Sequence, residues 1–171
     1  MSKPQRQQAA RNLLESLRSN DGRGITQATL YFRYYIHRAL VSAGYGDQYL
    51  EWLGLWRDAL SIGLTTWPEV PGETRSDCHG WGAHPTREIL AVVLGVESAG
   101  PGFREVSITP HIGGLKSISG IVPHPRGEMV VRLEKVKKGL DVEITLPPGV
   151  PGLIRFNNKK YPVKDHFHSV I

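Results

Sequence analysis

An α+β fold is predicted for this chain because the spacing of its apolar residues changes once along the sequence. Up to residue 97, apolar residues recur every three or four positions, as on one face of an amphipathic helix. Further along, short runs alternate apolar and polar residues, as in strands with one buried face. We therefore expect helices in residues 1–97 and an antiparallel β-sandwich in residues 98–171, with the boundary in the segment SAGPGF at 98–103.

The first part contains stretches with helical spacing at residues 11–17, 25–40, 47–60 and 85–95. Asp47 is a suitable N-cap, and Pro85 suits a first helical turn because its missing N–H needs no partner there. Gly95 is a suitable helix end. The third stretch carries an apolar stripe that we expect to be buried between helices: Tyr49, Trp52, Leu53, Trp56 and Leu60.

The second part contains short alternating runs around Val106, Val130, Val142 and Ile154. Lys138-Gly139 and Asn157-Asn158 fit tight hairpin turns, because Gly and Asn tolerate the positive φ that such turns need. These runs predict strands joined by hairpins.

Composition excludes several classes of protein. The net charge is +5, but the cations are scattered rather than clustered, so we expect no nucleic-acid partner. No run approaches the roughly 18 apolar residues of a membrane span, and the N-terminus lacks the apolar core of a secretion signal. The single cysteine, Cys78, cannot form an internal disulfide and is expected to be a buried thiol. We expect a cytoplasmic protein without a membrane partner, a metal site or a cofactor.

The segment 63–81, GLTTWPEVPGETRSDCHGW, is long and polar for a connection between helices. It combines carboxylates, one imidazole and two indoles. Hydrolysis of a glycoside needs one carboxyl group to protonate the leaving oxygen and a second to act as base or nucleophile, while aromatic faces hold the sugar ring. The segment therefore has the residue types of a glycosidase site, although composition alone is weak support for any one carboxylate.

Three runs strengthen this interpretation: residues 26–69 (ending in GLTTWPE), 74–85 (TRSDCHGWGAHP) and 102–115 (GFREVSITPHIGGL). In order and spacing they resemble the end of bacterial α-L-rhamnosidases. The resemblance implies that the helices are part of an α/α toroid, followed by a β-sandwich. It also implies an inverting mechanism, in which the two carboxyl groups stand about 6.5–9.5 Å apart with a water between them.

Residue roles follow from the same resemblance. Glu69 corresponds to the general base, with Glu73 in reserve. His79 is expected to bind sugar hydroxyls, and Trp81 and Trp67 to form the apolar wall of the site.

The helices predicted here are too few for a whole toroid, and the general acid is expected to be missing from this chain. The expected partners are a rhamnose-containing carbohydrate and either the missing catalytic part or a second copy of the chain. The alternative is a non-catalytic module that binds carbohydrate or is a structural remnant of such an enzyme.

Overall fold

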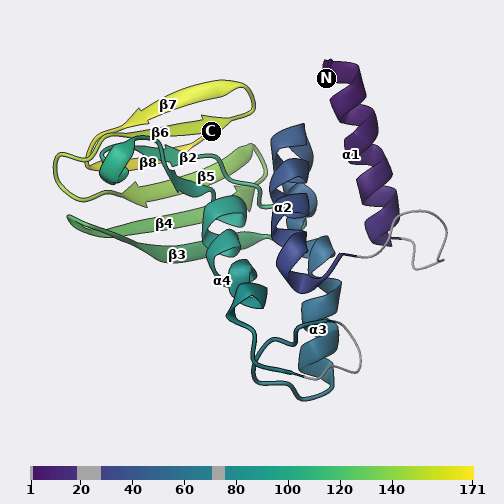
Figure 1. The fold of residues 1–171 in the computed structure, drawn as a ribbon. Coiled ribbons are helices and arrows are strands. Elements are labelled where there is room, and N and C mark those ends of the chain that lie inside the picture. The colour runs from purple at the N-terminus through teal and green to yellow at the C-terminus, as the bar shows by residue number, and fades with distance from the viewer. Residues whose placement is uncertain (1, 19–27, 71–75) are drawn as a thin grey trace. The chain divides into compact units, whose positions relative to one another are not determined.

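The computed structural model describes residues 2–18, 28–70 and 76–171. The chain divides into two compact units, Met1–Thr86 and Arg87–Ile171 (Figure 1). Helices come first and two mostly antiparallel sheets follow, which confirms the predicted α+β fold class. The units meet inside a helix, whereas the predicted domain boundary lies at 97/98; that assignment of domains stays a prediction.

The first unit is helical. It contains α1 (Lys3–Arg18), α2 (Leu30–Leu40), the π-helical turn η1 (Val41–Tyr45), the 3₁₀-helix η2 (Gly46–Leu53), α3 (Gly54–Ser61), the 3₁₀ turn η3 (Gly80–Ala83) and the start of α4 (His84–Glu88). Each predicted helical stretch overlaps these elements or η4 below, but α2 begins only at Leu30 and η4 ends at Val93, before the predicted end at Gly95. Residues 25–27 and the predicted breakers Gly22 and Gly24 lie outside the described part of the chain.

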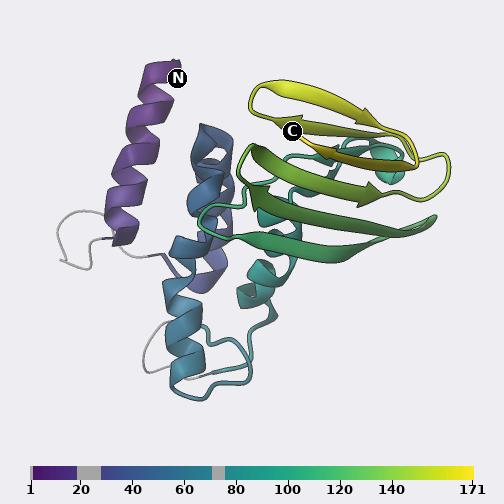
Figure 2. The ribbon, with the colours of Figure 1, turned by 180° about the vertical axis from the view of Figure 1, so that it is seen from behind.

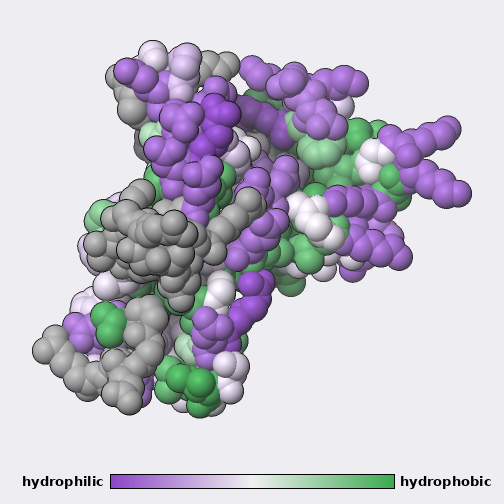
Figure 3. All heavy atoms as spheres, turned by 90° about the vertical axis from the view of Figure 1, so that its right-hand side faces the viewer, coloured by the Kyte–Doolittle hydropathy of each residue, from purple (hydrophilic) through white to green (hydrophobic). Residues whose placement is uncertain are grey.

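Helix α2 is the centre of the first unit. Its N-cap is Thr29, whose side-chain oxygen accepts a hydrogen bond from the backbone N–H of Phe32. One stripe of the helix is buried, at the three- and four-residue spacing of a helix face: Leu30, Arg33, His37 and Leu40. Figure 3 views the unit from the side of α1, whose solvent-facing residues are largely hydrophilic.

The aromatic stripe predicted for residues 47–60 is buried except at its end. Tyr49, Trp52, Leu53 and Trp56 are buried, whereas 58% of Leu60 is exposed, so the prediction is wrong for Leu60. The first half of this stretch is a 3₁₀-helix with about three residues per turn, and the second is an α-helix with 3.6. In the last turn of α3 the buried side runs through Trp56 and Ala59, so Leu60, next to Ala59, lies at the edge of that side and is exposed.

The second unit contains the end of α4, the π-helical turn η4 (Ile89–Val93), the 3₁₀ turn η5 (Pro101–Phe103) and eight strands. The strands are β1 (Val96–Ser98), β2 (Val106–Ile108), β3 (Ser117–His124), β4 (Gly127–Val136), β5 (Gly139–Thr145), β6 (Gly152–Phe156), β7 (Lys159–Val163) and β8 (His166–Val170). They form two four-stranded sheets with the orders β1-β2-β6-β7 and β3-β4-β5-β8 (Figure 2). The pair β2–β6 is parallel, so the first sheet is mixed rather than purely antiparallel.

Both sheets contribute to one hydrophobic core. Along β4, burial alternates, with Met129, Val131 and Leu133 inside and the residues between them exposed. Ile108 and Ile154 of the other sheet belong to the same core cluster. The second unit therefore consists of two sheets whose buried side chains belong to one core.

The two predicted hairpins are present. Asn157 and Asn158 form the β6–β7 turn and both have positive φ, 47° and 61°. In the β4–β5 hairpin, Val136 pairs with Gly139, so Lys137 and Lys138 form the turn and Gly139 begins the next strand. No helix of the described residues is long and apolar enough to cross a membrane.

Candidate functional site

The loop predicted to carry chemistry begins at a well-defined helix end. Gly63 has φ +86° and its N–H donates to the Leu60 carbonyl at 3.0 Å. The N–H of Leu64 donates to the Ala59 carbonyl at 3.1 Å. These two bonds form a Schellman motif, which needs the left-handed conformation that glycine adopts without strain. The motif sets the direction in which the chain leaves α3.

Two arms of the loop, residues 66–69 and 76–79, are joined by backbone hydrogen bonds. The N–H of Glu69 donates to the Ser76 carbonyl at 3.0 Å, and the N–H of His79 donates to the Trp67 carbonyl at 2.8 Å. The Thr66 hydroxyl donates to the Asp77 carbonyl. The predicted residues Trp67, Glu69 and His79 therefore belong to one hydrogen-bonded loop.

The loop is anchored beneath Trp67 by Gly82. A Cβ at residue 82 would lie 2.8 Å from the Cβ of Trp67, so no side chain fits there without a shift. The Gly82 carbonyl accepts a buried hydrogen bond from the Trp56 indole N–H at 2.7 Å. The Gly82 N–H donates to the His79 carbonyl at 3.0 Å. Gly82 thus joins the loop to α3.

Trp81 is the exposed ring of the site, and the half-buried His79 lies beside it. Their ring centroids lie 4.4 Å apart with the planes tilted by 35°. Trp81 is 48% exposed. The Nε2 atom of His79 is buried and has no hydrogen-bond partner in the described part of the chain. A buried polar atom without a partner is uncommon in folded proteins, so this nitrogen makes His79 a candidate binding residue.

Glu69 is half-buried, and its backbone is held by the pairing of the two arms. Glu73, the reserve carboxylate, falls in 71–75, outside the described residues. Cys78 is exposed, so the expectation of a buried thiol is wrong. Cys78 lies on the arm 76–79, which is held by backbone hydrogen bonds rather than by burial of its side chains in the core.

Behind the loop lies a buried cluster of rings around His37. Its ring centroid lies 5.4 Å from that of His84, 5.4 Å from that of Trp52 and 5.8 Å from that of Trp56. Burial, with smaller contributions from His84 and Arg33, lowers the pKa of His37 to about 3. Burial also lowers the pKa of His84 to about 4, against an opposing interaction with the Leu30 backbone. Both imidazoles are neutral at pH 7, so they pack as aromatic rings.

Sequence analysis missed one neighbour of Trp81. The ring of Tyr31, on α2, lies 5.9 Å from that of Trp81, and Tyr35 follows one turn later, with its ring 5.8 Å from that of Tyr31. Aromatic residues at positions i and i+4 of a predicted helix share a face, and this spacing was a signal that could have found them.

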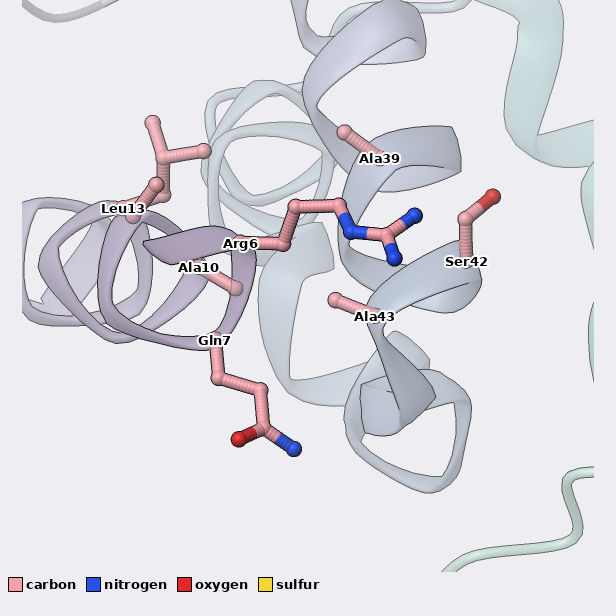
Figure 4. Close-up of a pocket in the computed structure, with 8 residues that line it drawn as sticks. Arg6, Gln7, Ala10, Leu13, Ala39, Ser42 and Ala43 are labelled. Carbon is pink, nitrogen blue, oxygen red and sulfur yellow. The ribbon is translucent and has the colours of Figure 1, made fainter. Parts of the chain in front are cut away.

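An apolar groove of about 510 Å³ lies elsewhere in the first unit, between α1 and α2 with η1 (Figure 4). It is lined by Arg6, Gln7, Ala9, Ala10, Leu13, Ala39, Ser42 and Ala43. These side chains carry no carboxylate and no imidazole, so the groove lacks the groups for acid–base chemistry. Within 2–18, 28–70 and 76–171, no group of three or more His, Cys, Asp or Glu is placed to hold a metal ion.

Comparison with known proteins agrees with the two-part fold. Residues 95–168 match the model of the bacterial alpha-L-rhamnosidase C-terminal domain. The GH78 family rhamnosidase of Bacillus sp. GL1 is 26% identical, covers 82% of this chain and superposes with a TM-score of 0.68. The alpha-L-rhamnosidase from Dictyoglumus thermophilum is 20% identical over 73% of the chain, with a TM-score of 0.64. The Streptomyces avermitilis alpha-L-rhamnosidase, solved with L-rhamnose, is 18% identical over 70%, with a TM-score of 0.58.

The chain spans only 17%, 15% and 13% of the lengths of these three structures. A search of curated proteins finds no match. These matches are all to one class of proteins, the α-L-rhamnosidases. More particularly, the chain resembles the C-terminal part of the bacterial α-L-rhamnosidases, and residues 95–168 carry the similarity to their C-terminal domain.

Proposed function

We propose that this chain is the C-terminal portion of a glycoside hydrolase that cleaves terminal α-L-rhamnose from glycans or glycosides with inversion. In this proposal, residues 1–97 are the end of an α/α toroid and residues 98–171 are the C-terminal β-sandwich domain. The substrate is a rhamnose-containing carbohydrate, and the protein is cytoplasmic. The partner is the part of the catalytic domain that supplies the general acid.

The proposed mechanism gives each loop residue one task. Glu69 removes a proton from a water molecule, which attacks the anomeric carbon on the face opposite the leaving group. The C–O bond to the leaving group breaks, and a carboxylic acid from outside these 171 residues protonates the departing oxygen. His79 binds sugar hydroxyls, and Trp81 and Trp67 form the apolar wall.

The observation that carries the proposal is the pairing of the two loop arms. It holds Glu69, Trp67 and His79 in one hydrogen-bonded loop, and the ring of Trp81 lies 4.4 Å from that of His79. The 26% identity to the Bacillus sp. GL1 rhamnosidase over most of the chain supports rhamnose as the sugar.

The test uses a chimera in which this chain replaces the corresponding C-terminal segment of the Bacillus sp. GL1 rhamnosidase. We expect the chimera to hydrolyse an aryl α-L-rhamnoside and to release β-L-rhamnose first, which proton NMR distinguishes from the α anomer. Glu69→Gln should lower kcat by about 10²–10⁴-fold, the usual contribution of general base catalysis. The isolated 171-residue chain should show no comparable turnover.

The control is Glu128→Gln, which changes an exposed carboxylate of β4 in the second unit. It should leave kcat unchanged. If Glu69→Gln has no larger effect than Glu128→Gln, Glu69 is not the base. If α-L-rhamnose appears first, the inverting mechanism is wrong. A chimera that folds and binds rhamnose without hydrolysing the substrate would favour the alternative, a non-catalytic carbohydrate-binding remnant.

A further inference from the structure

Four large aromatic side chains of the first unit are about half exposed. The exposed fractions are 48% for Trp81, 47% for Tyr31, 49% for Tyr35 and 55% for Phe32. Contiguous exposed aromatic surface is uncommon on a folded protein and marks sites where something binds.

Three of these rings form a continuous row that begins at the proposed sugar site. The His79–Trp81 ring distance is 4.4 Å, and the row continues from Trp81 to Tyr31 at 5.9 Å and from Tyr31 to Tyr35 at 5.8 Å. We call Trp81, Tyr31 and Tyr35 the aromatic row. Because Tyr31 and Tyr35 lie one turn apart on α2, the row follows the helix away from His79.

The edge of the row is polar. The hydroxyl oxygens of Tyr31 and Tyr35 lie 3.3 Å apart and share a hydrogen bond. That bond raises the pKa of Tyr35, so its phenol remains protonated at neutral pH. The row therefore offers aromatic faces together with hydroxyl groups that donate and accept hydrogen bonds.

This combination fits a sugar better than a protein surface. A pyranose ring has an apolar C–H face that stacks on an aromatic ring and hydroxyls at its edge that need hydrogen-bond partners. Aliphatic side chains, which would suit a helix from another chain, are exposed at the end of α3, at Leu60 and Ile62, and not within the row.

We propose that Tyr31 and Tyr35, the part of the aromatic row on α2, bind the second sugar of the substrate, the pyranose to which the terminal rhamnose is attached. The inference rests on the proposed function, because it takes His79 and Trp81 as the rhamnose site. Tyr35 then stacks on the sugar next to rhamnose and determines which leaving group is accepted.

The test measures binding to the 171-residue chain by ¹⁵N-labelled NMR, following the indole N–H signal of Trp81. Two probes are titrated: L-rhamnose and a disaccharide carrying α-L-rhamnose on glucose. The disaccharide should bind more tightly than rhamnose. Tyr35→Ala should weaken disaccharide binding by about threefold to tenfold, the value of one aromatic contact, and leave rhamnose binding unchanged. Tyr35→Phe, which keeps the ring, should retain most of the difference.

Ile62→Ala is the matched control, because Ile62 is 69% exposed in the same unit but lies outside the row. It should change neither affinity. Equal affinities for the two probes, or a disaccharide advantage that survives Tyr35→Ala, would overturn the inference while leaving the rhamnose site intact. Absence of binding by both probes would also overturn it, and the activity of the chimera would still test the proposed function separately. A dimer that Tyr35→Ala dissociates, detected by analytical ultracentrifugation, would show that the row is a contact between chains.

Discussion

Gly82 lies where the loop meets α3, and its lack of a side chain allows the Trp67 Cβ to approach. In Gly82→Ala, the new methyl carbon would lie 2.8 Å from the Cβ of Trp67, so either Trp67 or the turn η3 must move. We expect the free energy of unfolding to fall by about 1–3 kcal/mol, as in other overpacked sites. Urea unfolding followed by tryptophan fluorescence measures this.

Gly80→Ala is the matched control for this change, because a Cβ at Gly80 meets nothing within 4 Å. It lies two residues away in the same turn. If both variants lose the same stability, the effect belongs to the backbone of the turn and not to the contact with Trp67.

The buried imidazoles His37 and His84 predict acid sensitivity of the first unit. Their pKa values are lowered to about 3 and about 4, whereas a histidine in the unfolded chain titrates near ~6.5. At a pH between the folded and the unfolded pKa values, the unfolded chain binds more protons than the folded chain. The histidines therefore leave the free energy of unfolding unchanged above pH ~6.5 and lower it as the pH decreases below that value. The groups facing His37 are Arg33 and His84, both basic, so neither stabilises an imidazolium.

Tryptophan fluorescence reports the unfolding of the first unit, because all four tryptophans lie in it. We expect its unfolding midpoint in urea to decrease from pH 7 to pH 4.5. His37→Phe, which keeps an aromatic ring, should reduce the slope. An unchanged slope in His37→Phe would show that His84 or carboxylates, and not His37, account for the pH dependence.

The roles predicted for single residues depended on the resemblance to α-L-rhamnosidases more than on the spacing of apolar residues. The sequence shows Glu69, His79 and two indoles in one segment. It could not indicate the backbone hydrogen bonds from Glu69 to Ser76 and from His79 to Trp67, because backbone pairing inside an irregular loop has no periodic signal. Cys78 was assigned by the usual burial of thiols, and its surface position depends on the path of that loop.

At the scale of elements, Gly95 lies between the helical turn η4 and β1. It has φ +84°, and a Cβ there would lie 2.3 Å from the carbonyl carbon of Thr109. Gly95→Ala therefore combines a strained conformation with a clash against backbone. We expect it to abolish or severely weaken folding of the second unit, measured as loss of β-sheet circular dichroism and of the thermal transition.

Gly102 provides the control, because it also has positive φ, +65°, but a Cβ there meets nothing within 4 Å. Gly102→Ala should lower stability only by about 1–2 kcal/mol, the penalty for a left-handed residue. Equal losses at both positions would mean that conformation alone, and not the approach of Thr109, decides the effect.

Most elements were predictable because their causes are local. The Asn157-Asn158 turn follows from residues that tolerate positive φ, and the helical stretches follow from apolar spacing. The parallel pairing of β2 with β6 was not predictable, because alternation identifies a strand but not its partner. The exposure of Leu60 was not predictable, because apolar spacing does not show which of two adjacent apolar residues, Ala59 or Leu60, lies on the buried side of α3.

At the scale of the whole chain, the second unit should fold without the first, because one cluster of buried side chains joins both of its sheets. That cluster begins at Leu94 and Val96, before the predicted domain boundary at 97/98. Val96 pairs with Ile108 in the first sheet. Leu94 packs on Gly120 of β3: a Cβ added to Gly120 would lie 3.0 Å from a methyl carbon of Leu94. The position of the boundary therefore decides whether the core is complete.

Two fragments test this. Residues 87–171 should give a cooperative thermal transition and β-sheet circular dichroism. Residues 98–171 lack Leu94, Val96 and β1, and burial of each such side chain contributes about 1.5–3 kcal/mol. We expect the shorter fragment to lose about 3 kcal/mol or more of its unfolding free energy in urea. Equal stability of the two fragments would place the domain boundary at 97/98, as the sequence predicts, and would show that the residues before it do not support the sandwich.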